Sequence, residues 1–372
     1  MMLPREADRE RRLSAETCAP ERAWEHALRL EERDHSARLA GSFAWCRTAA
    51  DLLGDDATQH LLFRDGTGEV VGWTMLARAT AGWRSGSPRV ACLTWPFAAI
   101  GYRFRPRFAS DLDATVRGDW LAALHTACRG VRLELTRLDP QDAGGAIPGA
   151  FVERTSGPST WSIDVSGDAE AWYGTLEGKH RRDLKKYRRD IARVGARWCD
   201  TLDGASLEDS LDACFALHRR RIAHKGATSA CGEPRNERFL RALARHEAAR
   251  ATRVVVLRMD GEPAGACLSF AHHRRLEVTV SGWDQRFARY DLGRQVIHHQ
   301  ILREFERGLG EIDLLGGDLP YKREFGLRAR ETRDVVVRPT AFAAWREDVV
   351  GGALRVARMG RRLVAAGTRA RR

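Results

Sequence analysis

One segment in the second half of the chain combines side chains that can move protons with glycines that can admit a ligand. Residues 311–315 alternate as a strand and open into Gly316–Asp318, which is followed by Tyr321 and Lys322. A phenol can protonate a leaving thiolate, and an ammonium can stabilise an oxyanion. This run is typical of an active-site rim at the end of a strand in an α/β protein. It is equally compatible with a surface turn whose lysine lies along a half-buried face.

The segment from Phe287 to Arg294 leads the chain into a predicted helix over residues 293–307. The free N–H groups and the positive dipole end of a helix N-terminus attract phosphate, and Gly293 lets the main chain approach a ligand closely. A coenzyme A pyrophosphate would fit here, with added charge from Arg289 or Arg294. The alternative is an ordinary loop between a strand and a helix.

Residues 179–193 are strongly basic: eight Lys or Arg against two Asp give a net charge of +6. Helical spacing places Leu184, Tyr187 and Ile191 on one face and the charges on the rest. Such a helix is either a solvated surface or an anion-binding one. Nucleic acid would be bound by the same charges, although no named nucleic-acid motif accompanies them. The candidate contacts to an anionic substrate are Lys179, Arg182 and Lys186.

Composition limits the class of protein. The chain has 372 residues, a formal net charge of +12 and eight cysteines without metal-ligand or disulfide spacing, so we expect two domains, an anionic partner and no metal. The charged N-terminus predicts no signal peptide, and the longest apolar runs are too short to span a membrane. We therefore expect a cytoplasmic protein. The basic segment 353–372 has seven Arg and a loosely apolar side, so it is either a frayed end or a peripheral membrane contact.

The elements that must position these residues occur in the same order in two halves. The first half predicts a hairpin, a helix and a strand: 60–66 and 70–76, 111–128, and 131–135. The second half predicts a hairpin with an Asp-Gly turn, a strand, a helix and a strand: 253–258 and 264–270, 276–280, 293–307, and 311–315. Such a long repeat favours duplicated α/β domains. The predicted segments are a flexible lead-in 1–20, an N-terminal domain 21–150, a C-terminal domain 159–338 and a basic tail 339–372, with the boundary in 144–158.

Together these residues resemble one family. Trp172, the basic run 179–189 and Gly195 are similar to the entry helix of the CelD-type acetyltransferase-like family. That family belongs to the GNAT superfamily and was first associated with cellulose and exopolysaccharide biosynthesis. The match continues in order through Arg289-Tyr290-x-x-Gly293, Gly308, Asp313, Gly317-Asp318 and Tyr321-Lys322-x-x-Phe325-Gly326. It covers residues 159–338 well and the first half in general pattern.

The resemblance extends to the related FemAB-type peptidyltransferases, which have tandem GNAT-like domains. It implies a fold of two such domains, each a mixed, mostly antiparallel sheet flanked by helices. In those enzymes a lysine at the position of Lys322 acts at the acyl carbonyl, and GNAT enzymes often keep a carboxylate where Glu277 stands mid-strand. The glycine-rich loop of ordinary GNAT enzymes is reduced here to Gly293 after Arg289.

The resemblance therefore implies an acyltransferase that moves acetyl from acetyl-CoA, as co-substrate, to an amine or hydroxyl of a small molecule or polysaccharide precursor. Glu277, or a water, would accept the proton, Lys322 would hold the oxyanion, and Tyr321 or Tyr290 would protonate the leaving group. Asp318 completes the expected catalytic rim.

Two alternatives stay open. One is a FemAB-like transfer from aminoacyl-tRNA, in which the helix 179–193 would follow the RNA backbone. The other is a catalytically degenerate GNAT pair that serves as a scaffold for exopolysaccharide synthesis.

Overall fold

The computed structural model describes residues 13–34, 38–81, 90–112, 114–128, 131–144, 147–246 and 252–338. The strands are β1 (Ser14–Cys18), β2 (Thr58–Arg64), β3 (Val70–Ala81), β4 (Val90–Thr94), β5 (Arg107–Phe108), β6 (Arg132–Leu138), β7 (Phe151–Asp164), β8 (Arg197–Asp200), β9 (Thr252–Met259), β10 (Glu262–His272), β11 (Arg275–Trp283), β12 (Glu311–Gly316) and β13 (Arg328–Arg338).

The helices are α2 (Pro20–Arg33), α3 (Phe43–Leu53), α4 (Ala114–Gly118), α5 (Trp120–Ala127), α6 (Ala169–Thr175), α7 (Gly178–Arg193), α8 (Leu207–His224), α9 (Pro234–His246), α10 (Leu292–Arg307) and α11 (Pro320–Glu324). Short 3-10 turns are η1 (Asp55–Ala57), η2 (Pro140–Ala143), η3 (Thr201–Asp203), η4 (Ala230–Gly232) and η5 (Gln285–Tyr290).

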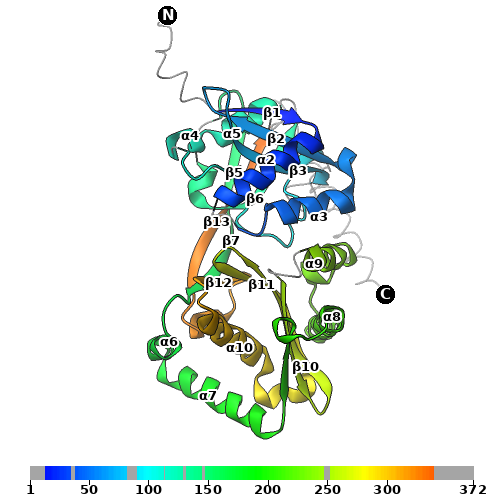
Figure 1. Ribbon diagram of the computed structural model, residues 1–372, viewed down its shortest axis with the longest axis vertical. Coiled ribbons are helices and arrows are strands. Elements are labelled where there is room, and N and C mark those ends of the chain that lie inside the picture. Colours follow the sequence, from blue (N-terminus) through cyan, green and yellow to red (C-terminus); the bar gives the residue numbers. More distant parts are fainter. Residues whose placement is uncertain are drawn as a thin grey trace, which may run out of the picture.

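Across the described residues the strands form one mixed sheet in the order β1-β2-β3-β4-β6-β13-β7-β12-β11-β10-β9-β8, with β5 added beside β3. In the first half the strands β1 to β4 pair antiparallel, and β4 then pairs parallel with β6. In the second half the strands β8 to β11 pair antiparallel, and β11 then pairs parallel with β12. A helix, α5 or α10, lies in each parallel connection, as such a crossover requires. The predicted mixed α/β fold is confirmed, and helices flank the sheet (Figure 1).

The hairpin predicted around Asp260-Gly261 forms between β9 and β10, with Met259 opposite Glu262. Asp260 and Gly261 both have positive φ, at 52° and 80°. A tight hairpin turn of the primed type needs that conformation at both central positions, which Asp and Gly adopt at low cost. Local sequence therefore sets this register.

The long strands β7 and β13 join the two lobes of the molecule, as Figure 1 shows for the orange strand β13. β13 pairs with β7 over most of its length and with β6 of the first half. Gly157 and Pro158, which lie in the predicted boundary segment, are inside β7 opposite a break in register. There the hydroxyl of Thr332 donates to the carbonyl of Pro158 at 2.9 Å. Proline is tolerated in a strand at such an irregularity because it lacks an N–H.

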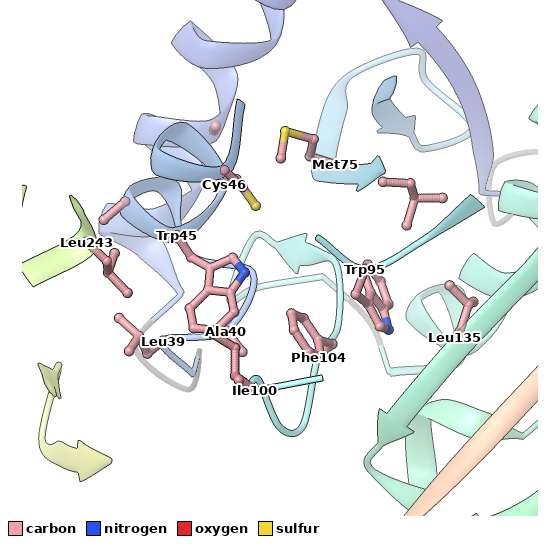
Figure 2. Packing of buried hydrophobic residues seen from close by; sticks show 14 of the residues in the cluster. Leu39, Ala40, Trp45, Cys46, Met75, Trp95, Ile100, Phe104, Leu135 and Leu243 are labelled. Atoms are coloured by element: carbon pink, nitrogen blue, oxygen red, sulfur yellow. The ribbon is translucent and has the colours of Figure 1, made fainter. Parts of the chain in front are cut away.

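A single hydrophobic cluster extends from the first half into the second (Figure 2). Trp45 of α3 packs against Phe239 of α9 with ring centroids 4.7 Å apart, and Phe97 stacks on the same ring at 3.9 Å. Figure 2 places Leu243, also from α9, beside Trp45. Because α9 belongs to the second half, this aromatic contact holds the two halves together.

Two predicted segments fall at the ends of the chain. The basic tail 339–372 and residues 1–12 lie outside the described residues. Residues 14–18, placed in the lead-in from the sequence, form β1, which is antiparallel to β2. No helix among the described residues has the length and apolar character needed to cross a membrane.

Candidate active site

The parallel strands β11 and β12 separate partway along their length. Their register runs through Arg275↔Glu311, Leu276↔Ile312 and Glu277↔Asp313 and then stops, although both strands continue. Leu315 near the end of β12 has a φ of +51°, which is unusual for a leucine. Main-chain groups and side chains of both strands are thereby exposed to the space between them.

A cavity of about 250 Å³ fills this space. β11 and β12 supply two walls, helix α8 and the following loop supply the third, and residues 99–102 of the first half close it. A second cavity of about 320 Å³ adjoins it at the N-terminus of α10. The two share four lining residues: Arg221, Ser281, Leu319 and Tyr321. Together they offer room for a reacting group and for the body of a ligand that reaches it.

Lys322 lies beneath the first cavity and is buried. Its ammonium donates to the carbonyls of Leu314, Leu315 and Gly316, each at 2.9 Å. An ammonium has three protons, so all of them are engaged by the main chain of β12. Burial lowers the pKa of Lys322 to about 8, and the charge of Asp313 opposes the shift. In this arrangement Lys322 holds the distorted end of β12 in place.

Tyr321 faces both cavities, whereas Asp318 lines neither of them. Burial raises the pKa of Tyr321, so its phenol is protonated at neutral pH and can donate a proton. Asp318 is exposed and forms an ion pair with Arg323 at 2.8 Å. Tyr321 therefore faces the cavities, whereas Asp318 faces solvent.

Glu277 is buried at the last paired position of β11, opposite Asp313 of β12. The main-chain N–H of Leu39 donates to its carboxyl at 3.1 Å. Burial, together with the charge of Asp313, raises the pKa of Glu277 to about 8. Glu277 is not among the residues that line either cavity. Its carboxyl ties the first half of the chain to the second.

Asp313 lies in the same buried cluster. Burial raises its pKa to about 6, while the N–H of Leu315, which donates to it at 2.7 Å, favours the charged form. Arg38 approaches Asp313 at 3.6 Å and Glu311 at 3.4 Å. Because the cluster contains fully buried charges, removing one partner would leave another uncompensated.

The predicted phosphate site at the start of α10 is built around Gly293. A Cβ at this position would lie 3.1 Å from the Trp283 ring, so glycine allows the helix to start against the indole. Arg294 lines the second cavity and pairs with Asp291 at 3.2 Å and Glu324 at 3.1 Å. The cavity thus has cations that could meet an anion, partly balanced by two carboxylates.

The side chains of Arg289 and Tyr290 do not reach the predicted phosphate site. Arg289 lies over the Tyr290 ring at 4.8 Å, and Tyr290 is buried in a small hydrophobic cluster with Leu292. Neither residue lines the two cavities. They therefore stabilise the start of α10 by packing and do not line a cavity.

The basic helix α7 keeps its predicted amphipathic character, with Leu184 and Ile191 buried. The predicted anion contacts Lys179, Arg182 and Lys186 are exposed and lie outside the two cavities. Three other basic residues of α7 line an open hollow of about 610 Å³ between α6 and α10: Lys185, Arg188 and Arg189.

Sequence patterns missed several lining residues of the first cavity. His218 and Arg221 come from α8, Ser229 and Cys231 from the loop that follows, and Tyr102 from the first half. A run of Arg at 219–221 was the one visible signal near them. The five residues converge only through the packing of α8 on β11 and of one half on the other.

Comparison with known proteins agrees with this architecture. Residues 178–323 match the acetyltransferase (GNAT) domain family. No curated protein sequence matches the chain. The structure of FemX is similar over 90% of this chain and 100% of that one, with a TM-score of 0.62 and 9% identity. L-PGS from Bacillus licheniformis is similar over 91% and 98%, with a TM-score of 0.53 and 13% identity. Both likenesses concern the fold and include both halves.

Proposed function

We propose that the protein transfers an acyl group, with acetyl-CoA as donor, to an amine or hydroxyl of a small molecule or polysaccharide precursor. The observation that carries this proposal is the pair of joined cavities between the separated strands β11 and β12 and the N-terminus of α10. The thioester would lie in the first cavity and the anionic part of coenzyme A in the second, near the helix dipole. The match to the GNAT family supports this assignment.

The lining side chains suggest how the step proceeds. Tyr321 protonates the departing thiolate, since its phenol keeps its proton at neutral pH and reaches both cavities. Lys322 holds the end of β12, and with it the wall against which the acyl group lies. Gly293 and Arg294 contact the donor. Glu277 is not used, because it lies outside the cavity lining.

Calorimetric titration with acetyl-CoA tests the donor. We expect one site per chain and affinity about tenfold lower in Arg294→Gln, because a cation facing the donor is lost. Arg303→Gln, which alters a cation farther along α10 that pairs with Asp203, serves as the control. The proposal fails when neither acetyl-CoA nor a longer acyl-CoA binds.

A second candidate is transfer from aminoacyl-tRNA, as in the FemAB-type enzymes that the sequence resembles. The likeness of fold to FemX and the exposed cations of α7 favour it. tRNA binding would weaken steeply with salt, and it would be lost when Lys185, Lys186, Arg188 and Arg189 are replaced by Ala. The matched control replaces four exposed arginines of α2 and α3: Arg22, Arg29, Arg33 and Arg47.

A further inference from the structure

His218 is held between two hydrogen-bond partners whose chemistry fixes its protons. Nδ1 lies 2.8 Å from the carbonyl oxygen of Ser281, and Nε2 lies 2.9 Å from the hydroxyl of Ser229. A carbonyl oxygen can only accept, so Nδ1 carries a proton and donates it. Burial lowers the pKa of His218, which keeps the ring neutral at pH 7. Nε2 is then a free base that accepts from Ser229.

Close packing fixes the position of this histidine. α8 approaches β11 so closely that a Cβ on Gly282 would collide with the main chain of Leu217 and His218. The glycine therefore permits the contact, and the ring of His218 is buried with its Nδ1 tied to β11. A base held in this way does not have to be ordered before it takes a proton.

Ser229 occupies a helix N-cap position, where a serine hydroxyl usually accepts a hydrogen bond from a main-chain N–H of the helix. It is the N-cap residue of η4, yet its hydroxyl makes no capping hydrogen bond. The hydroxyl instead meets His218, and both side chains line the first cavity beside Tyr321. Arg221 lines the same cavity, and its buried Nε has no hydrogen-bond partner within the described part of the chain. A nucleophile, a base and a cation thus face one space.

We propose that Ser229 and His218 form a nucleophile–base pair that takes the acyl group from the donor to give an acyl-serine. The inference rests on the proposed function for the identity of the donor. The Ser229 oxygen bonds to the thioester carbonyl carbon as its proton passes to Nε2 of His218. The C–S bond breaks, Tyr321 protonates the departing thiolate, and the proton on Nε2 passes to the Tyr321 oxygen, which restores both side chains. The acceptor amine then attacks the ester and loses a proton to His218, which returns it to Ser229.

Cys231 lines the same cavity and is the competing nucleophile. Burial raises the pKa of its thiol to about 11, so the thiolate is scarce at neutral pH. Its sulfur faces the carbonyl of Thr279 at 3.6 Å rather than a base. The serine has the general base and the cysteine does not.

An alkyl fluorophosphonate tests the pair without any natural substrate, because an activated serine displaces its fluoride and retains the phosphonyl group. Intact mass and peptide mapping should show one adduct per chain, on Ser229. Labelling should be absent in Ser229→Ala and fall about 100-fold in His218→Asn. The asparagine amide can still donate to the Ser281 carbonyl, so the packing tie is retained. Ser166→Ala, which removes an exposed serine bonded to Asp164, should label as the wild type does.

The outcomes separate this inference from the proposed function. An unlabelled wild type, or an adduct that persists in Ser229→Ala, overturns the nucleophile–base pair whether or not acetyl-CoA binds. A labelled Ser229 in a chain that binds no acyl-CoA supports the pair and refutes the proposed donor. Near-ultraviolet circular dichroism of His218→Asn establishes that lost labelling is not lost folding.

Discussion

Burial sets the protonation of the titratable side chains around the first cavity. It raises the pKa of Tyr321 and of Cys231 and lowers that of His218. At neutral pH the cavity therefore contains a phenol and a thiol with their protons and an imidazole without its second one. This combination gives the site one acid, Tyr321, and one base, His218, at the same pH.

Tyr321→Phe tests the acid. The variant keeps the ring and loses the proton that we assign to the leaving thiolate, so we expect acyl transfer to slow about 100-fold with little change in donor affinity. Steady-state rates together with calorimetry measure the two effects. A variant with unchanged rate, or with donor affinity reduced as strongly as the rate, contradicts the assignment.

Glu277→Gln tests the buried carboxyl pair through stability. Folding raises the pKa of Glu277 from the usual 4.5 to about 8. Its stabilising contribution is thus complete below pH 4.5 and is lost as the pH rises through 8, because the native state holds the proton more tightly. Between pH 5 and pH 8 the wild type should lose about 3–4 kcal/mol more unfolding free energy than the variant.

Urea unfolding at several pH values measures that difference, with Glu262→Gln in an exposed position of β10 as control. Glutamine can still accept from the N–H of Leu39, so the hydrogen bond across the halves is kept. Parallel pH profiles in the wild type and Glu277→Gln would show that Glu277 is ionised in the folded protein.

At this scale the sequence predicted only part of the site. Tyr321, Lys322, Gly293 and Arg294 do line the cavities, because they follow directly from a strand end and a helix start. Their roles remain predictions. No sequence spacing predicted that His218, Ser229 and Tyr102 belong to the site, because they lie on three separate segments that meet only in the folded protein.

At the scale of elements, the packing of α8 on β11 decides the shape of the site. Gly282→Ala would place a methyl group against the main chain of α8. We expect a loss of about 1–3 kcal/mol in unfolding free energy and a displaced His218. Denaturant unfolding measures the first effect, and fluorophosphonate labelling reports the second. Gly167→Ala, at a position with open space around the Cβ, should change neither.

Most elements could be predicted because their signals are local. The expected helix 293–307 is α10 (Leu292–Arg307), and the expected strand 311–315 is β12 (Glu311–Gly316). The Asp-Gly turn gave the β9–β10 hairpin directly. β7 was not predicted because Gly157 and Pro158 normally interrupt a strand, and only its partner β13 accommodates them.

For the whole molecule, one sheet and one hydrophobic cluster join the halves, so we expect them to unfold together. Phe239→Ala removes the ring that packs on Trp45 and Phe97 and should lower the unfolding free energy by about 3–5 kcal/mol. Tryptophan fluorescence and circular dichroism should report one coincident transition. Phe151→Ala, at a ring that is 42% exposed, is the control. Two separate transitions in the wild type would contradict the single unit.

The domain limits 21–150 and 159–338 remain a proposal at this scale. A repeated order of elements identifies two halves, but it carries no information about pairing between them. The contact of β13 with β6 joins residues about 200 positions apart, such as Val337 and Leu133, and no local sequence period predicts it.

That crossing strand also has a consequence for synthesis. β6 is translated before β13, its neighbour in the finished sheet, which spans Arg328–Arg338 and leaves the ribosome about half a chain length later. Until then the nascent first half exposes an unsatisfied strand edge, which is prone to pair with other chains. We therefore expect the first half to complete its folding only after translation has passed residue 338, and a chaperone that shields β6 to have its greatest effect before then.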